Sequence, residues 1–223
     1  TGPPVLVMGM HRSGTSLVAR LLRSMGMFVG ADTDANEEAR FFQAINRRVL
    51  HALGGDWHRP DTPVELLGEE EIRSLAVEMV RRELEGLRTV RYLGISRLVR
   101  ARLGRLPDEP WGWKDPRNTL TLPLWIDLFP RLRVVHVTRH GVDVAASLAR
   151  RGQDRMRSLQ KRKASESDSR KLRGDWISDA LYCRSVEEGF ALWKRYVDQG
   201  HRWKERLADR YLEIRFENLV QDP

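Results

Sequence analysis

The feature that most constrains this chain is a short apolar run that ends in a glycine-flanked turn and leads directly into a helical pattern. Residues 5–8 read Val-Leu-Val-Met, which has the length and composition of a buried strand. From Thr15 onward the apolar side chains recur at helical spacing: Leu17, Val18, Leu21, Leu22 and Met25. A strand, a turn and a helix in this order begin a β-α unit and predict an α/β fold.

The same pattern returns later in the chain. Residues 133–138 form a second apolar strand pattern, and residues 141–150 return to helical spacing. A short strand that runs into a turn is expected at 111–116, and a final alternating strand at 211–216. Strands that alternate with helices predict a P-loop-containing nucleotide-binding fold, with a central parallel sheet and helices on both faces.

The remaining helical patterns are less regular. We expect helices over residues 41–53, over about 65–87, over 120–129 with an early interruption at Pro123, and over 177–207 with breaks near Gly189 and Gly200. Residues 30–38 read as an acidic loop, and residues 88–108 match no single pattern.

Composition bounds the class of protein. The chain has 223 residues, of which 41% are hydrophobic. We therefore predict that residues 1–223 form one domain with a hydrophobic core. We expect the natural domain to continue beyond Pro223. No apolar run approaches the roughly 18–20 residues that cross a bilayer, so no membrane segment is predicted. The single cysteine, Cys183, excludes an intrachain disulfide and suits a reducing compartment, which predicts a cytoplasmic location.

The positive charge is concentrated in one segment. Residues 150–173 hold ten Lys or Arg and three Asp or Glu, which accounts for most of the net charge of +8. We predict a basic loop or lid insertion at about 150–173. Because no aromatic side chain lies between these charges, the segment gives no indication of a nucleic-acid partner.

The turn after the first strand has the spacing of a phosphate loop. Gly9 and Gly14 are separated by four residues, and Thr15 and Ser16 follow, as in the pattern G-x-x-x-x-G-K-[ST]. Backbone amides of such a turn, at the start of a helix, converge on a phosphate. Thr15 stands where an NTPase has its lysine, and Arg12 supplies a cation nearby. The turn therefore predicts a phosphate site that is poorly suited to ATP or GTP hydrolysis.

A second pair of polar residues follows the strand at 133–138. Arg139 comes directly after this strand, and Ser147 lies eight residues later on the expected helix. A guanidinium and a hydroxyl in this arrangement suit a phosphate dianion. The alternative is that Arg139 pairs with Asp143 and that Ser147 is an ordinary helix residue.

These motifs together resemble those of PAPS-dependent sulfotransferases, where PAPS is 3′-phosphoadenosine 5′-phosphosulfate. Residues 5–16 look like the 5′-phosphosulfate loop of the bacterial-type enzymes, and Arg139 with Ser147 matches the family's 3′-phosphate pair at the same interval. Residues 113–116, Trp-Lys-Asp-Pro, resemble a segment of the tyrosylprotein and carbohydrate sulfotransferases. Residues 211–223 are similar to a late family segment, but Phe216 replaces its usual tyrosine, so no contact through a hydroxyl is carried over.

The resemblance implies a single sulfotransferase domain, of EC 2.8.2 type. It would move the sulfuryl group from PAPS to a hydroxyl or amine of a carbohydrate, peptide or small-molecule acceptor, release PAP, and require no metal. In this interpretation Arg12 and Lys114 stabilise the transferring group. The residues expected to bind the nucleotide are Arg12, Ser13, Gly14, Thr15, Ser16, Arg139, Ser147 and Arg151.

The general base is the least defined part of this prediction. Asp32 lies at about the distance from Arg12 where the tyrosylprotein enzymes place their base, so it is the predicted catalytic carboxylate. The same acidic loop also holds Asp34, Glu37 and Glu38. His11, inside the phosphate loop, could move a proton or orient the turn.

Two other functions stay open on the sequence. One is a small-molecule kinase on the same fold, against which Thr15 and the pair Arg139 and Ser147 argue. The other is a non-catalytic nucleotide-binding domain, against which the presence of both Arg12 and Lys114 argues. The acceptor and the oligomeric state cannot be read from the sequence.

Overall fold

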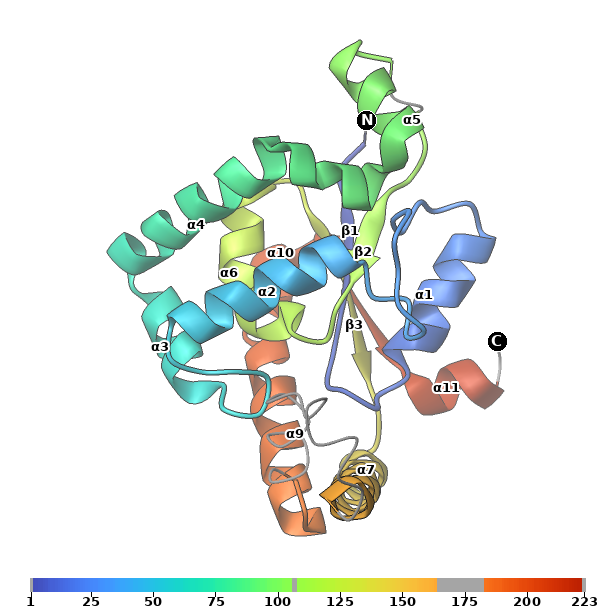
Figure 1. Cartoon of the computed structure of the whole chain (residues 1–223), viewed down its shortest axis with the longest axis vertical. Coiled ribbons are helices and arrows are strands. Elements are labelled where there is room, and N and C mark those ends of the chain that lie inside the picture. Colours follow the sequence, from blue (N-terminus) through green and yellow to red (C-terminus); the bar gives the residue numbers. More distant parts are fainter. Residues whose placement is uncertain (1, 106–107, 164–182, 222–223) are drawn as a thin grey trace.

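The computed structural model describes residues 2–105, 108–163 and 183–221, and its elements are labelled in Figure 1. The strands are β1 (Val5–Met8), β2 (Gly112–Lys114), β3 (Arg133–Thr138) and β4 (Tyr211–Arg215). The helices of the first half are α1 (Thr15–Ser24), α2 (Arg40–Ala52), α3 (Asp61–Gly68), α4 (Glu70–Glu85), the 3₁₀ turn η1 (Leu87–Thr89) and α5 (Val90–Arg102). Those of the second half are α6 (Asn118–Leu128), α7 (Gly141–Lys163), α9 (Val186–His201), α10 (Lys204–Leu207), the 3₁₀ turn η3 (Ala208–Arg210) and α11 (Phe216–Gln221).

The four strands form one parallel sheet in the order β2-β1-β3-β4. In the centre of the sheet, Leu6 lies opposite Trp113 on one side and Val134 on the other. Because all the strands are parallel, their carboxyl ends meet at one edge, where the turns after β1, β2 and β3 lie together. The expected central parallel sheet is therefore present.

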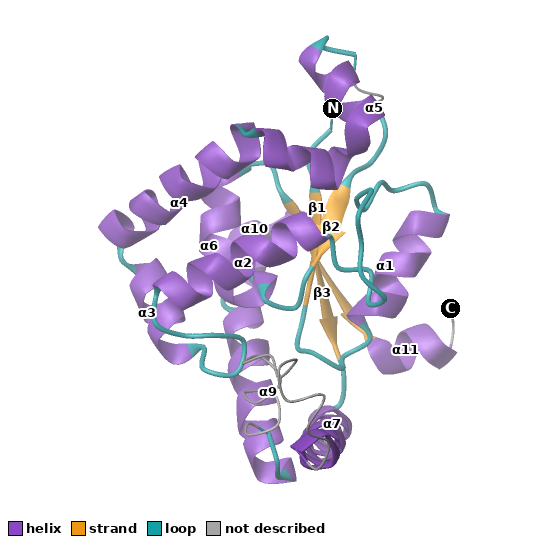
Figure 2. Ribbon diagram, viewed as in Figure 1, coloured by secondary structure: helices purple, strands orange, loops and turns teal. Residues whose placement is uncertain are grey.

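Helices cover both faces of this sheet, as Figure 2 shows. On one face the side chains of Leu6 and Met8 join a large core with α2 and α6, which includes Phe42 and Trp125. On the other face, Val7 packs in a smaller core with the following side chains of β3, α1 and α11: Val135, Val137, Val18, Leu22 and Leu219. The alternation of buried side chains along a central strand requires this two-sided covering, and the predicted α/β architecture is confirmed.

The helix after β3 is longer than its apolar pattern predicted. Helix α7 continues from Gly141 to Lys163, so residues 150–163, expected as part of a loop, are helical. Straight-chain Arg, Lys, Gln, Leu and Met dominate this stretch, and these residues favour a helix even without an apolar face to bury. The rest of the expected basic loop, residues 164–173, lies outside the described residues.

The predicted break near Gly200 is confirmed, because α9 ends at His201 and α10 begins at Lys204. The predicted break near Gly189 is wrong, because α9 begins at Val186 and continues through this glycine. A Cβ added at Gly189 would lie 3.0 Å from the Cα of Ala145, and one at Gly200 would lie 2.4 Å from Cε1 of His136. The two glycines therefore let α9 approach α7 and β3 closely, so both have a packing role, and Gly200 also lies next to the end of the helix.

Two further helices differ in their bounds from the sequence prediction. The single helix expected over about 65–87 is two helices, separated at Glu69, whose ψ of 126° is extended. Helix α6 begins at Asn118 and continues through Pro123 rather than stopping there. The helix expected over 41–53 is present as α2, and it ends before Gly54, whose φ is +76°.

Candidate functional site

The turns that follow the parallel strands line one polar pocket of about 460 Å³. Strand β1 leads into its glycine turn, β2 ends at Lys114, β3 leads to Arg139, and β4 is followed by Phe216. The remaining lining residues come from the glycine turn, α1, the loop before α2, the turn after β2 and α7: His11, Arg12, Gly14, Thr15, Ser16, Leu17, Arg20, Asn36, Glu38, Pro116 and Arg151. This is the edge of an open parallel sheet at which ligands bind.

The glycine turn has the backbone geometry of an anion-binding loop. Gly9 has a φ of 141° and its amide donates to Oγ1 of Thr119 at 3.1 Å. A Cβ at Gly9 would lie 2.3 Å from the carbonyl oxygen of Val137, so only glycine fits there. Gly14 has a φ of 91° and lies directly against the ring of Phe216. Both glycines therefore hold the turn close to the sheet.

Helix α1 begins immediately after this turn. Thr15 and Ser16 are its first two residues, and amides in the first turn of a helix have no carbonyl partner within the helix. The helix dipole adds partial positive charge at the same point, so this end favours an anion. Ser13 is buried in the turn, and its Oγ has no hydrogen-bond partner within the described structure.

The two predicted phosphate sites meet in this pocket. The Nε of Arg12 donates to Oγ of Ser147 at 2.9 Å, although the two residues are 135 positions apart. Arg139 Nη1 lies 3.4 Å from the carbonyl oxygen of Arg12, and its guanidinium lies 4.8 Å from the centre of the Phe216 ring. Arg139 also forms the ion pair with Asp143 that the alternative predicted, at 3.7 Å on an exposed helix surface. Arg139 and Ser147 therefore face the loop at residues 9–16.

His11 and Arg151 lie on another side of the pocket, around Trp57. The His11 ring contacts the Trp57 ring edge-on at 4.8 Å, and the Arg151 guanidinium lies 5.7 Å from the centre of the Trp57 ring. Burial and then the positive charge of Arg117 lower the pKa of His11 well below its usual value, so this imidazole is neutral at pH 7. Its Nε2 has no partner within the described structure.

Lys114 forms a buried ion pair in the pocket. Its Nζ lies 2.9 Å from Oε1 of Glu38, 3.1 Å from the carbonyl oxygen of Asn36 and 3.4 Å from Oγ of Ser16. Its side chain is only 2% exposed and that of Glu38 only 6%. Burial alone would raise the pKa of Glu38, but the charges of Lys114 and Arg117 lower it overall. Glu38 is therefore an ionised carboxylate beside the phosphate loop.

A polar network beneath the pocket fixes this ion pair. Arg117 Nη1 contacts Oδ1 of Asp115 at 3.0 Å and Oε2 of Glu38 at 3.5 Å, and Asn46 donates to Oδ2 of Asp115 at 2.9 Å. The sequence prediction did not include Arg117 or Asn46. Arg117 directly follows the Lys-Asp-Pro segment and could have been found there, but nothing in the sequence links Asn46 to it.

The predicted base, Asp32, does not lie in this pocket. Its carboxylate lies 3.1 Å from Nε of Arg40 and 3.9 Å from Nε of Arg91, on the outer side of the loop. Asp34 holds the loop in shape, because its Oδ1 accepts from the amides of Asn36 and Glu38 at 2.8 and 2.9 Å. This turn directs Glu38, rather than Asp32, toward Lys114.

The described residues contain neither a metal-binding group nor a membrane-spanning helix. Among residues 2–105, 108–163 and 183–221, no group of three or more His, Cys, Asp or Glu side chains has the arrangement to hold a metal ion. None of the helices described has the length and apolar content needed to cross a membrane.

Solved structures similar to this chain carry sulfotransferase names. One is a sulfotransferase domain from the curacin biosynthetic pathway, with 17% identity, a TM-score of 0.47, and coverage of 100% of this chain and 70% of that one. Another is a sulfotransferase of Mycobacterium tuberculosis, with 14% identity, a TM-score of 0.46, and coverage of 99% and 64%. A third is the sulfotransferase domain of a Synechococcus olefin synthase, with 19% identity, a TM-score of 0.44, and coverage of 100% and 69%.

Comparison of the sequence itself decides the family. No curated protein sequence matches the chain significantly. The profile of the Sulfotransferase family matches residues 3–223, which spans the phosphate loop, the Arg139 and Ser147 pair and the final strand. The chain therefore belongs to the Sulfotransferase family and is an enzyme of the sulfotransferase class.

Proposed function

We propose that this enzyme transfers the sulfuryl group of PAPS to a hydroxyl or amine of a carbohydrate, peptide or small-molecule acceptor. The observation that carries the proposal is the contact between Arg12 and Ser147, with Arg139 beside them. This contact supports the proposal because groups suited to anions, from two distant parts of the sequence, lie beside each other, and a nucleotide with phosphates at both its 5′ and 3′ positions would need both.

The first step in the proposal is binding of the nucleotide. The amides of Gly14, Thr15 and Ser16, together with the side chain of Arg12, would hold the 5′-phosphate at the start of α1. The Ser13 hydroxyl, which has no partner within the described structure, is a further donor in this loop.

The second anchor would hold the 3′-phosphate. Arg139, which lines the pocket, would supply a guanidinium, and Ser147, whose Oγ contacts Arg12, would supply a hydroxyl. Arg151 follows one turn later along α7 and also lines the pocket, so we assign it to the same nucleotide. These residues would distinguish PAPS from nucleotides that lack a 3′-phosphate.

Group transfer would then proceed in line. The bond between sulfur and the 5′-phosphate oxygen breaks, a bond from sulfur to the acceptor oxygen or nitrogen forms, and PAP leaves with the electron pair. Lys114 and Arg12 would stabilise the negative charge on the sulfuryl oxygens and on the departing phosphate. Neither step needs a metal ion.

The acceptor's proton must go to a base in the same pocket, and we assign this role to Glu38. Its carboxylate is ionised, lines the pocket and lies next to Lys114, whereas Asp32 pairs with Arg40 outside it. A proton moved from the acceptor to Glu38 leaves that side chain neutral until solvent removes the proton.

Calorimetric titration of the chain tests the proposed nucleotide. PAP without metal is expected to bind tightly, because both anchors are used, and ATP with Mg²⁺ is expected to bind much more weakly. A preference for ATP with Mg²⁺ over PAP would contradict the proposal and favour a kinase on the same fold.

A further inference from the structure

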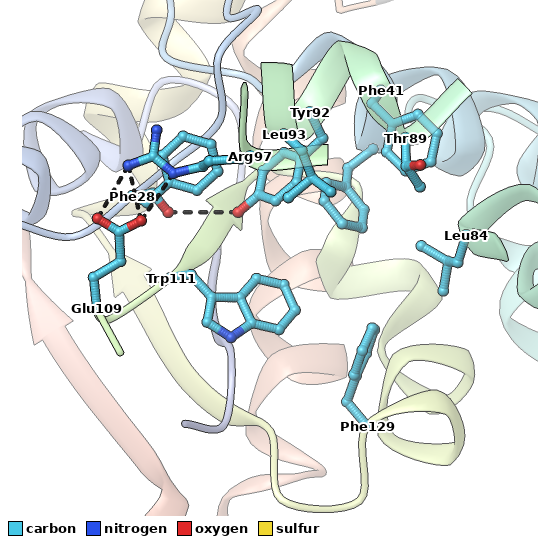
Figure 3. Close-up of a pocket in the computed structure, with 11 residues that line it drawn as sticks. Phe28, Phe41, Leu84, Thr89, Tyr92, Leu93, Arg97, Glu109, Trp111 and Phe129 are labelled. Atoms are coloured by element: carbon cyan, nitrogen blue, oxygen red, sulfur yellow. Dashed lines mark hydrogen bonds and ion pairs between the residues drawn. The ribbon is translucent and has the colours of Figure 1, made fainter. Parts of the chain in front are cut away.

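A second hollow lies at the amino end of β2, whereas the nucleotide pocket lies at its carboxyl end. It is open to solvent, has a volume of about 260 Å³ and lies between α2, α4 and α5, and Figure 3 shows its walls. Most of the side chains that line it are aromatic or aliphatic: Phe28, Phe41, Phe42, Leu84, Tyr92, Leu93, Trp111 and Phe129. Thr89, Arg97 and Glu109 complete the lining.

The two pockets are separate sites. They share no lining residue, and β2 joins them from opposite ends. Phe28 pairs with Trp111 immediately before β2, whereas Glu38 pairs with Lys114 at its last residue. A molecule in the hollow therefore does not occupy the nucleotide site.

The walls of the hollow are fixed by contacts among themselves. Tyr92 packs edge-on against Phe28 at 5.1 Å and against Phe42 at 4.8 Å between ring centres, and its hydroxyl donates to the carbonyl oxygen of Gly112 at 2.7 Å. Phe42 in turn stacks on Trp113 at 4.0 Å. These contacts hold the walls in place without an occupant, as in the largely preformed and mostly apolar pockets that bind small molecules.

The polar groups of the lining are already satisfied by the protein. Arg97 and Glu109 form two hydrogen bonds, at 2.9 and 3.1 Å, and the Arg97 guanidinium also lies 4.1 Å from the centre of the Phe28 ring. Oγ1 of Thr89 donates to the carbonyl oxygen of Gly86 at 2.7 Å. A charged ligand would have to break these pairs, so the hollow favours an occupant without charge.

We propose that this hollow is a binding site for a neutral, apolar small molecule with two or three aromatic rings. An apolar cavity of about 150 Å³ holds benzene, so this larger volume accommodates a larger ring system. Ring edges and faces on several sides suit an aromatic guest. This site does not depend on the proposed nucleotide or acceptor.

The probe for this site is N-phenyl-1-naphthylamine, a neutral molecule in which a nitrogen atom joins a naphthyl group to a phenyl group. Its fluorescence rises in apolar surroundings. Titrated into the whole chain, it is expected to bind saturably at one site, and saturating PAP is expected not to displace it. Displacement by PAP, or a signal that never saturates, would overturn the proposal.

Paired substitutions locate the probe. L93F fills the hollow from α5 and is expected to weaken probe binding by about tenfold or more, equivalent to about 1.4 kcal/mol. L87F is the matched control, because Leu87 is 76% exposed and does not line the hollow. L84F, which fills the hollow from α4, replaces L93F if that variant does not fold. Equal probe affinity in the filling and control variants would overturn the assignment.

Discussion

At the scale of single residues, the proposed mechanism depends on which carboxylate faces the phosphate loop. Asp32 and Glu38 belong to the same acidic loop, and spacing from Arg12 favoured Asp32. The structure pairs Asp32 with Arg40, and it pairs Glu38 with Lys114 in a site where both side chains are almost completely buried. A carboxylate can act as the base only if the acceptor can reach it, and of these two residues only Glu38 lines the pocket.

E38Q is therefore expected to lower kcat by about 10²–10⁴-fold, the usual contribution of a general base. The amide keeps the shape of the side chain, so PAP affinity is expected to stay within a few-fold of wild type. D32N is the matched control and is expected to retain wild-type kcat. Steady-state kinetics and PAP titration of both variants test this assignment. Loss of activity in D32N with normal activity in E38Q would reverse it.

At the scale of elements, the sequence patterns predicted where most strands and helices form, but not which residues of different elements contact each other. Residues 133–138 form a strand because they are a continuous apolar run, and this was predictable. Gly189 was misread as a break, because the reason for this glycine lies in another element: a Cβ there would lie 3.0 Å from the Cα of Ala145 on α7. The direction of Glu38 was unpredictable for the same reason, since its bridge to Lys114 joins two segments that are distant in the sequence.

G200A tests the packing role of α9. The added methyl group would lie 2.4 Å from Cε1 of the buried His136, so we expect a loss of about 1–3 kcal/mol in the free energy of unfolding. G68A is the control, because a Cβ at that helix end meets no atom within 4 Å, and it is expected to be neutral or stabilising by up to about 1 kcal/mol. Urea denaturation measures both. Equal stability of the two variants would show that α9 does not need a glycine there.

At the scale of the whole molecule, every strand contributes to the nucleotide pocket. The glycine turn follows β1, Lys114 ends β2, Arg139 follows β3 and Phe216 follows β4. Because these residues come directly after predicted strands, most of the pocket could be predicted from the sequence once a parallel sheet was assumed. Asn46 could not be predicted, because its contact with Asp115 beneath the pocket joins two segments that are distant in the sequence.

The stability of the whole fold is expected to depend on pH through His136. Burial, reinforced by the positive charge of His201, lowers the pKa of His136 to about 4. The unfolded chain, with a histidine pKa of about 6.5, therefore binds the proton more readily, so stability is complete above pH 6.5 and is lost as the pH falls toward 4. The contribution of this group is about 3 kcal/mol over that range.

H136Q checks this assignment through the slope of stability with pH. Chemical denaturation between pH 4 and 7 is expected to show about one proton fewer taken up on unfolding in the variant than in the wild type. The absolute stability of H136Q does not enter the comparison. An unchanged slope in this range would assign the acid sensitivity to other groups.

The most direct test of the central claim is the ratio of AMP to PAP dissociation constants, measured by calorimetry without metal in wild type, R139A and R133A. Arg133 lies at the other end of β3 and is the control. The account predicts a strong preference for PAP in wild type and R133A, reduced about 10- to 100-fold in R139A, because a charged contact to the 3′-phosphate is lost. A ratio that is the same in all three proteins would contradict the assignment of Arg139 and, with it, the proposed PAPS site.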